Sequence, residues 1–109
     1  MKPTKIKFIS EKLEKEFKNL DEEDFLKKSI KKALADLKTN AFFGIQIPKR
    51  LFPKKYIEKY SLTNLWKYDL PKGWRLIYTI TAEDEVEIVC AILEWFNHKN
   101  YERRFKYLF

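Results

Sequence analysis

The spacing of apolar residues changes once along this chain, near residue 40, and this change limits the folds that the chain can adopt. Between residues 10 and 40, apolar side chains recur every three or four positions, as on amphipathic helices. Ser10 and Asp21 are expected to cap two such helices, and Asn40 suits the end of the second. Because the connection between them is short, the helices should form an antiparallel hairpin. An alternating segment at residues 5–9 predicts a strand before the hairpin.

Beyond residue 40 the apolar residues alternate or form continuous runs, which is typical of strands. Extended segments are expected at residues 43–47, 65–70, 74–80 and 86–93. The last of these is almost entirely apolar, which predicts a central strand buried on both faces. Pro71-Lys72-Gly73 has the composition of a hairpin turn, and Asn97 is expected to cap a short basic C-terminal helix. The predicted fold class is α+β, with the N-terminal strand and helical hairpin packed on an antiparallel sheet of about four strands.

The composition predicts one domain that prefers anionic partners. A chain of 109 residues fits a single domain spanning residues 1–109, and 45% hydrophobic residues with 17% aromatic residues can fill its core. The formal net charge of +7 favours nucleic acid, an acidic membrane or an acidic protein as partner. No apolar run has the length of a membrane span, and the single cysteine, Cys90, fits a reducing cytoplasm. Abundant Lys and Glu with few glycines also give a thermophile-like composition.

Positive charge is concentrated in two segments, residues 48–60 and residues 95–109, and both also contain tyrosines. Pro53 lies inside the first segment, and the residues after it predict a short helix. Such a composition suits RNA, because phosphates attract the cations and unstacked bases stack on the rings. The alternative is that the rings belong to the core and the lysines only keep the protein in solution. The candidate nucleic-acid-binding residues are Lys49, Arg50, Lys54, Lys55, Arg103 and Arg104.

The inventory of reactive side chains favours chemistry without a metal or another cofactor. One histidine and one cysteine cannot make a Cys/His metal site, and the acidic run at residues 21–24 suits a helix N-terminus. RNA cleavage needs no protein nucleophile, because the 2′-hydroxyl can attack the adjacent phosphate with help from acids, bases and an arginine. The candidate catalytic residues are Arg75, His98, Tyr101, Lys67 and Lys99. For His98 and Tyr101, whose spacing also suits packing on a helix, a structural role is the alternative.

Two motifs resemble the RelE/ParE superfamily of toxins from type II toxin–antitoxin systems. Trp74-Arg75-Leu76-Ile77-Tyr78 is similar to the arginine-containing strand of that family. His98-Lys99-Asn100-Tyr101-Glu102-Arg103 resembles the C-terminal ending of its HigB-like branch. The resemblance covers residues 65–105 by motif and the whole chain by order of elements. It implies a RelE/ParE-like fold and a ribosome-dependent mRNA endoribonuclease.

The resemblance also implies roles for residues and a set of partners. Arg75 would stabilise the phosphate, and Lys67 would be a basic residue of the preceding strand. His98, Lys99 and Tyr101 would be the catalytic candidates of the tail. The implied partners are mRNA on the ribosome and an acidic antitoxin protein, with no membrane involved, and formation of a homodimer stays open.

Two features depart from the family pattern. Asp69 stands where RelE toxins have a second lysine, and a carboxylate there opposes phosphate binding. The basic segment at residues 48–60 is not a standard element of the short toxins. ParE-like relatives inhibit DNA gyrase without known nuclease chemistry, so a non-catalytic binding protein, which binds gyrase or RNA, is the main alternative. An interaction module whose basic surface only meets an acidic partner is the second alternative.

The strand that contains Arg75 allows one geometric expectation. Strand alternation puts Arg75 on the face opposite to its apolar neighbours in the sequence. If those neighbours pack under the helices, Arg75 should be exposed on the open side of the sheet, beside His98, in one concave basic site.

Overall fold

The structure is a computed structural model that describes residues 4–82 and 88–105. Its strands are β1 (Thr4–Phe8), β2 (Ile45–Gln46), β3 (Trp66–Asp69), β4 (Arg75–Ala82) and β5 (Ile88–Phe96). Its α-helices are α1 (Glu11–Lys18), α2 (Phe25–Thr39), α3 (Lys54–Tyr60) and α4 (His98–Phe105). Short 3-10 helices, Lys49–Leu51 and Pro71–Gly73, precede α3 and β4. Residues 86–87 of the last expected strand and residues 106–109 of the basic tail lie outside the described residues.

The sheet has the strand order β1-β5-β4-β3-β2. β1 pairs with β5 in parallel, and the other neighbouring pairs are antiparallel. The α+β class is therefore confirmed, but the described sheet is mixed and has five strands, not about four. The difference arises because the N-terminal strand joins the sheet beside β5, with Thr4 opposite Ile88. β5 is a central strand, as expected, and its residues 89–93 are buried.

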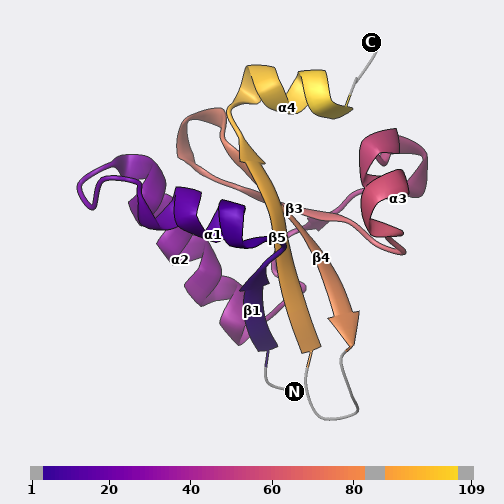
Figure 1. Cartoon of the computed structure of the whole chain (residues 1–109), viewed down its shortest axis with the longest axis horizontal. Helices are drawn as coiled ribbons and strands as arrows, with labels where there is room; N and C mark the ends of the chain where they lie inside the picture. The colour runs from indigo at the N-terminus through magenta and orange to yellow at the C-terminus, as the bar shows by residue number, and fades with distance from the viewer. Residues whose placement is uncertain (1–3, 83–87, 106–109) are drawn as a thin grey trace.

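One face of the sheet is covered by the hairpin of α1 and α2, which lies to the left of the sheet in Figure 1. Its core combines apolar residues of α2 with alternating residues of β4 and β5. The fully buried members of this cluster are Ile30, Ala33, Leu37, Leu76, Tyr78, Cys90 and Ile92. Leu76 and Tyr78 thus lie under the helices, which confirms this part of the geometric expectation for β4.

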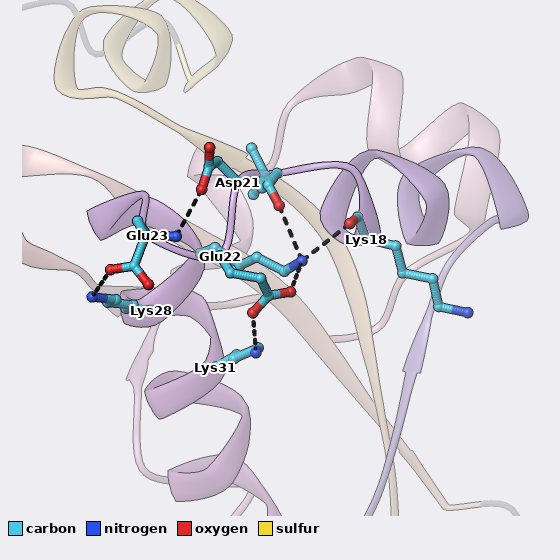
Figure 2. A network of polar contacts seen from close by, with 8 residues as sticks. Lys18, Asp21, Glu22, Glu23, Lys28 and Lys31 are labelled. Carbon is cyan, nitrogen blue, oxygen red and sulfur yellow. Dashed lines mark hydrogen bonds and ion pairs between the residues drawn. The ribbon is translucent and has the colours of Figure 1, made fainter.

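The connection between α1 and α2 contains a dense polar network (Figure 2). Ser10 caps α1 as expected, but Asp24, not Asp21, caps α2 by accepting a hydrogen bond from the Leu26 amide. Asp21 instead accepts from the Glu23 amide, which forms a turn before the helix.

Lys27 is almost completely buried, and its Nζ donates to the Lys18 and Leu20 carbonyls and to Glu22 Oε1. This lysine therefore ties the end of α1 to the start of α2.

The opposite face of the sheet is not open, because α3 and α4 pack on it. A second core cluster joins the strands to these two helices. Its buried members are Ile47, Tyr56, Leu65, Ile77, Leu93, Tyr101 and Phe105. Figure 1 shows α3 to the right of the sheet and α4 at the end of β5. The expectation of an open sheet face behind Arg75 was wrong, since a short helix in the basic segment and a second one in the tail suffice to cover it.

The turn between β3 and β4 fixes the position of Arg75. Gly73 has a φ of 79°, in the left-handed region that glycine adopts without strain, and Lys72 is also left-handed, with a φ of 61°. A Cβ atom at Gly73 would lie 3.2 Å from the Cβ of His98. The turn therefore places the start of β4 next to the start of α4.

Candidate nucleic-acid interface

The two basic segments of the sequence meet at one pocket, called here the basic pocket. Its volume is about 690 Å³. The lining residues are Arg50, Leu51, Phe52, Pro53, Lys54, Lys55, Phe96, Asn100, Arg103, Arg104 and Phe105. Five of the six candidate nucleic-acid-binding residues are among them, and Lys49 is the one that is not. Cations from parts of the chain that are far apart in sequence are thus gathered around one hollow.

The basic pocket is held in shape by contacts that join α3, α4 and β5. The buried ring of Tyr56 packs edge-on against Phe105, with centroids 6.1 Å apart. The Tyr56 hydroxyl donates to Glu94 Oε1 at 2.5 Å, while Arg104 Nη2 lies 3.3 Å from Glu94 Oε2. Burial, followed by the hydrogen bond to Glu94, raises the pKa of the Tyr56 phenol. Tyr56 therefore stays neutral and acts as a structural donor that fixes α3 beside α4.

Most of the cations around the basic pocket are not neutralised by the protein. Within residues 4–82 and 88–105, Arg50, Lys55 and Arg103 form no ion pair. Lys54 lies 3.9 Å from Glu58, a contact on an exposed helix surface that is worth little. Arg104 Nε is buried and has no hydrogen-bond partner in the described structure. An anionic oxygen in the basic pocket would supply the partner that Arg50, Lys55 and Arg103 lack.

A second group of charged residues, called here the Arg75 cluster, consists of Lys67, Asp69, Arg75 and Tyr101. Arg75 lies over the Tyr101 ring at 5.5 Å from its centroid, and Lys67 Nζ lies over the same ring at 5.7 Å. Asp69 Oδ1 is 2.9 Å from Arg75 Nε and 3.5 Å from Lys67 Nζ. Pairing of β3 with β4 puts Asp69 directly opposite Arg75, and Tyr101 reaches both cations from α4. Three of the five candidate catalytic residues are thereby brought together.

Arg75 does not have the exposed position that strand alternation suggested. Its side chain is only 18% exposed and is ion-paired with Asp69, so the expectation that Arg75 would be exposed was wrong. The physical reason is that α4 covers this face of the sheet and that Asp69 lies in register with Arg75. The tail does lie beside Arg75, as expected, but the contact is made by Tyr101.

His98 and Lys99 lie at the start of α4, outside the Arg75 cluster. The side chain of His98 is 63% exposed, and its Nε2 is paired with Glu102 Oε1 one turn later on the helix. Asn97 Oδ1 accepts from the Asn100 amide at 2.8 Å, which confirms Asn97 as the cap. Lys99 is exposed and forms no ion pair within the described ranges. Neither residue is joined to Lys67 or Arg75 by a hydrogen bond or ion pair in the described part of the chain.

Sequence reasoning identified Asp69 as an opponent of phosphate binding, but it gave no site role to Glu94, Glu102, Phe52 or Phe96. Glu94 holds Tyr56 and Arg104, Glu102 holds His98, and Phe52 and Phe96 supply the rings of the basic pocket. The four-residue spacing of His98 and Glu102 on a helix was a usable signal. Glu94 gave no such signal, because its partners come from helices whose placement depends on the whole fold.

Other kinds of site find little support in the described residues. They contain no group of three or more His, Cys, Asp or Glu side chains that could hold a metal ion. Burial raises the pKa of the Cys90 thiol to about 12, so this cysteine is a poor nucleophile. Among the described helices, none has both the length and the apolar character needed to cross a membrane. Comparisons of the chain with protein-family models, with curated proteins and with solved structures find no match.

Proposed function

We propose that this protein binds RNA in the basic pocket and cleaves it as a metal-independent, toxin-like endoribonuclease of the RelE/ParE kind. Its substrate is mRNA on the ribosome, and an acidic antitoxin neutralises it. The observation that carries the proposal is the convergence of Arg50, Lys54, Lys55, Arg103 and Arg104 on one pocket. Cations that line a single hollow from separate elements suit a chain of phosphates better than they suit general solubility.

The rings at the basic pocket favour RNA with unpaired bases over a duplex. Phe52 and Phe96 are both partly exposed and belong to the pocket lining. Arg104 lies over the Phe96 ring at 5.4 Å from its centroid, so a cation and an aromatic surface already lie together at the pocket. A base displaced from its stack can lie on such a surface while its phosphate meets the arginine. Stacked bases inside a duplex offer no free face for this contact.

Cleavage would use the 2′-hydroxyl of the RNA as the nucleophile. A base removes the proton of this hydroxyl, its oxygen attacks the adjacent phosphorus, and the 5′ oxygen leaves with a proton from an acid. Arg75 and Lys67 would stabilise the charge that develops on the phosphate, because both are fixed on the Tyr101 ring. His98 would transfer protons, with Glu102 orienting its ring, and Lys99 would bind a neighbouring phosphate.

One observation favours a second candidate function, which is RNA binding without cleavage. Asp69 contacts both cations that the reaction needs, and so it competes with the phosphate. A protein with the same basic pocket but a neutralised Arg75 would bind RNA and leave it intact.

The two candidates are separated by an assay of mRNA cleavage on translating ribosomes, with analysis of the new RNA ends. The proposed chemistry leaves a 2′,3′-cyclic phosphate and a 5′-hydroxyl. Arg75→Ala should slow cleavage about a hundredfold, the usual effect of losing one preorganised charge. His98→Ala should slow it by a similar factor of about a hundred, because the proposed proton-transfer group is lost.

Lys15→Ala, which removes an exposed charge on α1, is the matched control and should cleave like the wild type. Thermal unfolding of each variant shows whether it is folded. Full activity of both site variants, or ends that carry a 5′-phosphate, would refute the mechanism. RNA that is bound in the basic pocket but never cut would establish the second candidate.

A further inference from the structure

Asp69 occupies the position that an anion bound by the Arg75 cluster would take. A single oxygen, Oδ1, lies 2.9 Å from Arg75 Nε and 3.5 Å from Lys67 Nζ. β3 and β4 are paired so that Asp69 directly faces Arg75, at the end of β3. A phosphate oxygen placed between the same two cations would make the same pair of contacts.

The two cations are held in place by packing, but the carboxylate is not. The side chains of Arg75 and Lys67 are 18% and 21% exposed, and both lie over the buried ring of Tyr101. The side chain of Asp69 is 48% exposed. Rotation of Asp69 into solvent would therefore leave the cations where they are, ready for another anion.

The contact between Asp69 and Arg75 also leaves a donor unsatisfied. Arg75 Nε is buried and has no hydrogen-bond partner in the described structure, although Asp69 Oδ1 lies within ion-pair distance. The carboxylate is close enough for attraction but lies in the wrong direction for the N–H group. A buried donor without an aligned acceptor is costly, so this ion pair holds Asp69 less firmly than an aligned hydrogen bond would.

The charges of the cluster do not balance while Asp69 is in place. Lys67 and Arg75 bring two positive charges, and Asp69 is the one acid within ion-pair distance of either in the described residues. A positive charge therefore remains in a largely covered position, where solvent screens it poorly. The cluster keeps some attraction for anions even when Asp69 occupies it.

We propose that Asp69 is a built-in competitor of phosphate, which makes the Arg75 cluster selective for an anion that is also anchored in the basic pocket. Free phosphate displaces the tethered carboxylate poorly. RNA held in the basic pocket presents a further phosphodiester at a high effective concentration and displaces it, because Phe96 of the pocket lining lies opposite Arg75 in the pairing of β4 with β5. The identification of this phosphate with RNA rests on the proposed function, whereas the competition itself does not.

The first test measures binding of a fluorescein-labelled single-stranded RNA of mixed sequence. Asp69→Asn keeps the shape of the side chain and removes its charge. It should tighten RNA binding about tenfold, since a like charge no longer faces the phosphate. One additional phosphate contact should steepen the slope of log affinity against log salt by about 0.7.

Glu23→Gln is the matched control, because it causes the same change of net charge at an exposed position on the α1–α2 connection. It should change RNA affinity far less than Asp69→Asn. In the Arg75→Gln background, Asp69→Asn should bring no gain. Equal effects of Asp69→Asn and Glu23→Gln, or a gain that survives Arg75→Gln, would overturn the inference. If Asp69→Asn does not fold, Asp69→Ser takes its place.

The second test uses inorganic phosphate and follows the Arg75 Nε–H resonance by NMR. The resonance should shift at a lower phosphate concentration in Asp69→Asn than in the wild type. Identical titrations, or no shift in either protein, would show that Asp69 does not compete with phosphate. A difference between the titrations without any RNA binding would remove the proposed function and leave the competition established.

Discussion

Lys27 shows how much a single side chain contributes to the helical hairpin. Its ammonium group is 3.0 Å from the carbonyl oxygens of Lys18 and Leu20 and 2.6 Å from Glu22 Oε1. All three of its hydrogens have acceptors, which is what a buried lysine requires. It also lies over the Phe17 ring, at 5.6 Å from the centroid. The carbonyls of Lys18, at the end of α1, and of Leu20, just after it, therefore accept hydrogen bonds from a donor on α2.

The first prediction concerns Lys27→Met, which keeps the length of the side chain and removes its donors. The carbonyls of Lys18 and Leu20 would lose a charged donor, so the free energy of unfolding should fall by about 1–3 kcal/mol. Urea denaturation measures this change. Lys28→Met, on the exposed side of the same helix, is the control and should change it by less than about 0.5 kcal/mol. Equal losses in the two variants would contradict a special role for Lys27.

At the scale of elements, the connection between α1 and α2 depends on ionised carboxylates. Hydrogen bonds from Lys27 and then Lys31 lower the pKa of Glu22 from 4.5 to about 2. A hydrogen bond from Tyr68 likewise lowers the pKa of Asp36 on α2. A lowered pKa in the folded state means that the fold favours the charged form. The contribution of Glu22 to the stability of the fold is therefore complete above pH 4.5, and it is lost as the pH falls towards 2.

The second prediction follows from the lowered pKa of Glu22 in the folded state. Glu22→Gln should make the fold less sensitive to acid, so Tm should fall less between pH 4.5 and pH 2 than it does in the wild type. Some acid sensitivity should remain, because Asp36 still has its partners. Glu23→Gln, at the neighbouring exposed position, should keep the wild-type profile when Tm is followed by circular dichroism. A Glu22→Gln profile parallel to that of the wild type would rule out this linkage.

Elements were predictable from the sequence wherever local signals decide them. Ser10 and Asn97 cap their helices as expected, because a cap depends only on the next three residues. The second helix was assigned the wrong cap, since residues 21–24 offer several carboxylates and only the turn geometry selects Asp24. The parallel pairing of β1 was missed, because periodicity identifies a strand and not its neighbour.

The candidate site was also predicted only where local sequence features decide it. Charge segregation along the sequence identified five of the residues that line the basic pocket. The state of Arg75 was not predictable, because it depends on the register of β3 against β4 and on the placement of α4. Neither this strand register nor the position of α4 can be deduced from the local amino-acid composition.

At the scale of the whole molecule, positive charge is distributed unevenly over two layers of helices. On α1 and α2 many lysines are balanced by acids, as in the pairs Lys28–Glu23 and Lys32–Asp36. Around the basic pocket the balance is poorer, since Arg50, Lys55 and Arg103 have no acidic partner in the described residues. RNA should therefore approach from the side of α3 and α4.

The third prediction tests this asymmetry through the salt dependence of RNA binding. Changing Lys54 and Lys55 together to Gln should lower the magnitude of the slope of log affinity against log salt by about 1.4. Each contact with a phosphate of single-stranded nucleic acid contributes about 0.7 to this slope. Changing Lys12 and Lys15 on α1 to Gln removes the same charge from the other layer and should leave the slope unchanged. Equal decreases in the two variants would mean that RNA binding does not involve the basic pocket.

The pairing of β1 with β5 has a consequence for how the protein is made. Nearly the whole described chain lies between these two strands, so the sheet cannot close until residues 88–96 have left the ribosome. Contacts between such distant segments form slowly, because a long loop must be closed first. α4 follows directly after β5 and supplies one wall of the basic pocket. A nascent chain that lacks β5 and α4 therefore has neither the complete sheet nor this wall of the basic pocket, and these two segments complete the core and the pocket together.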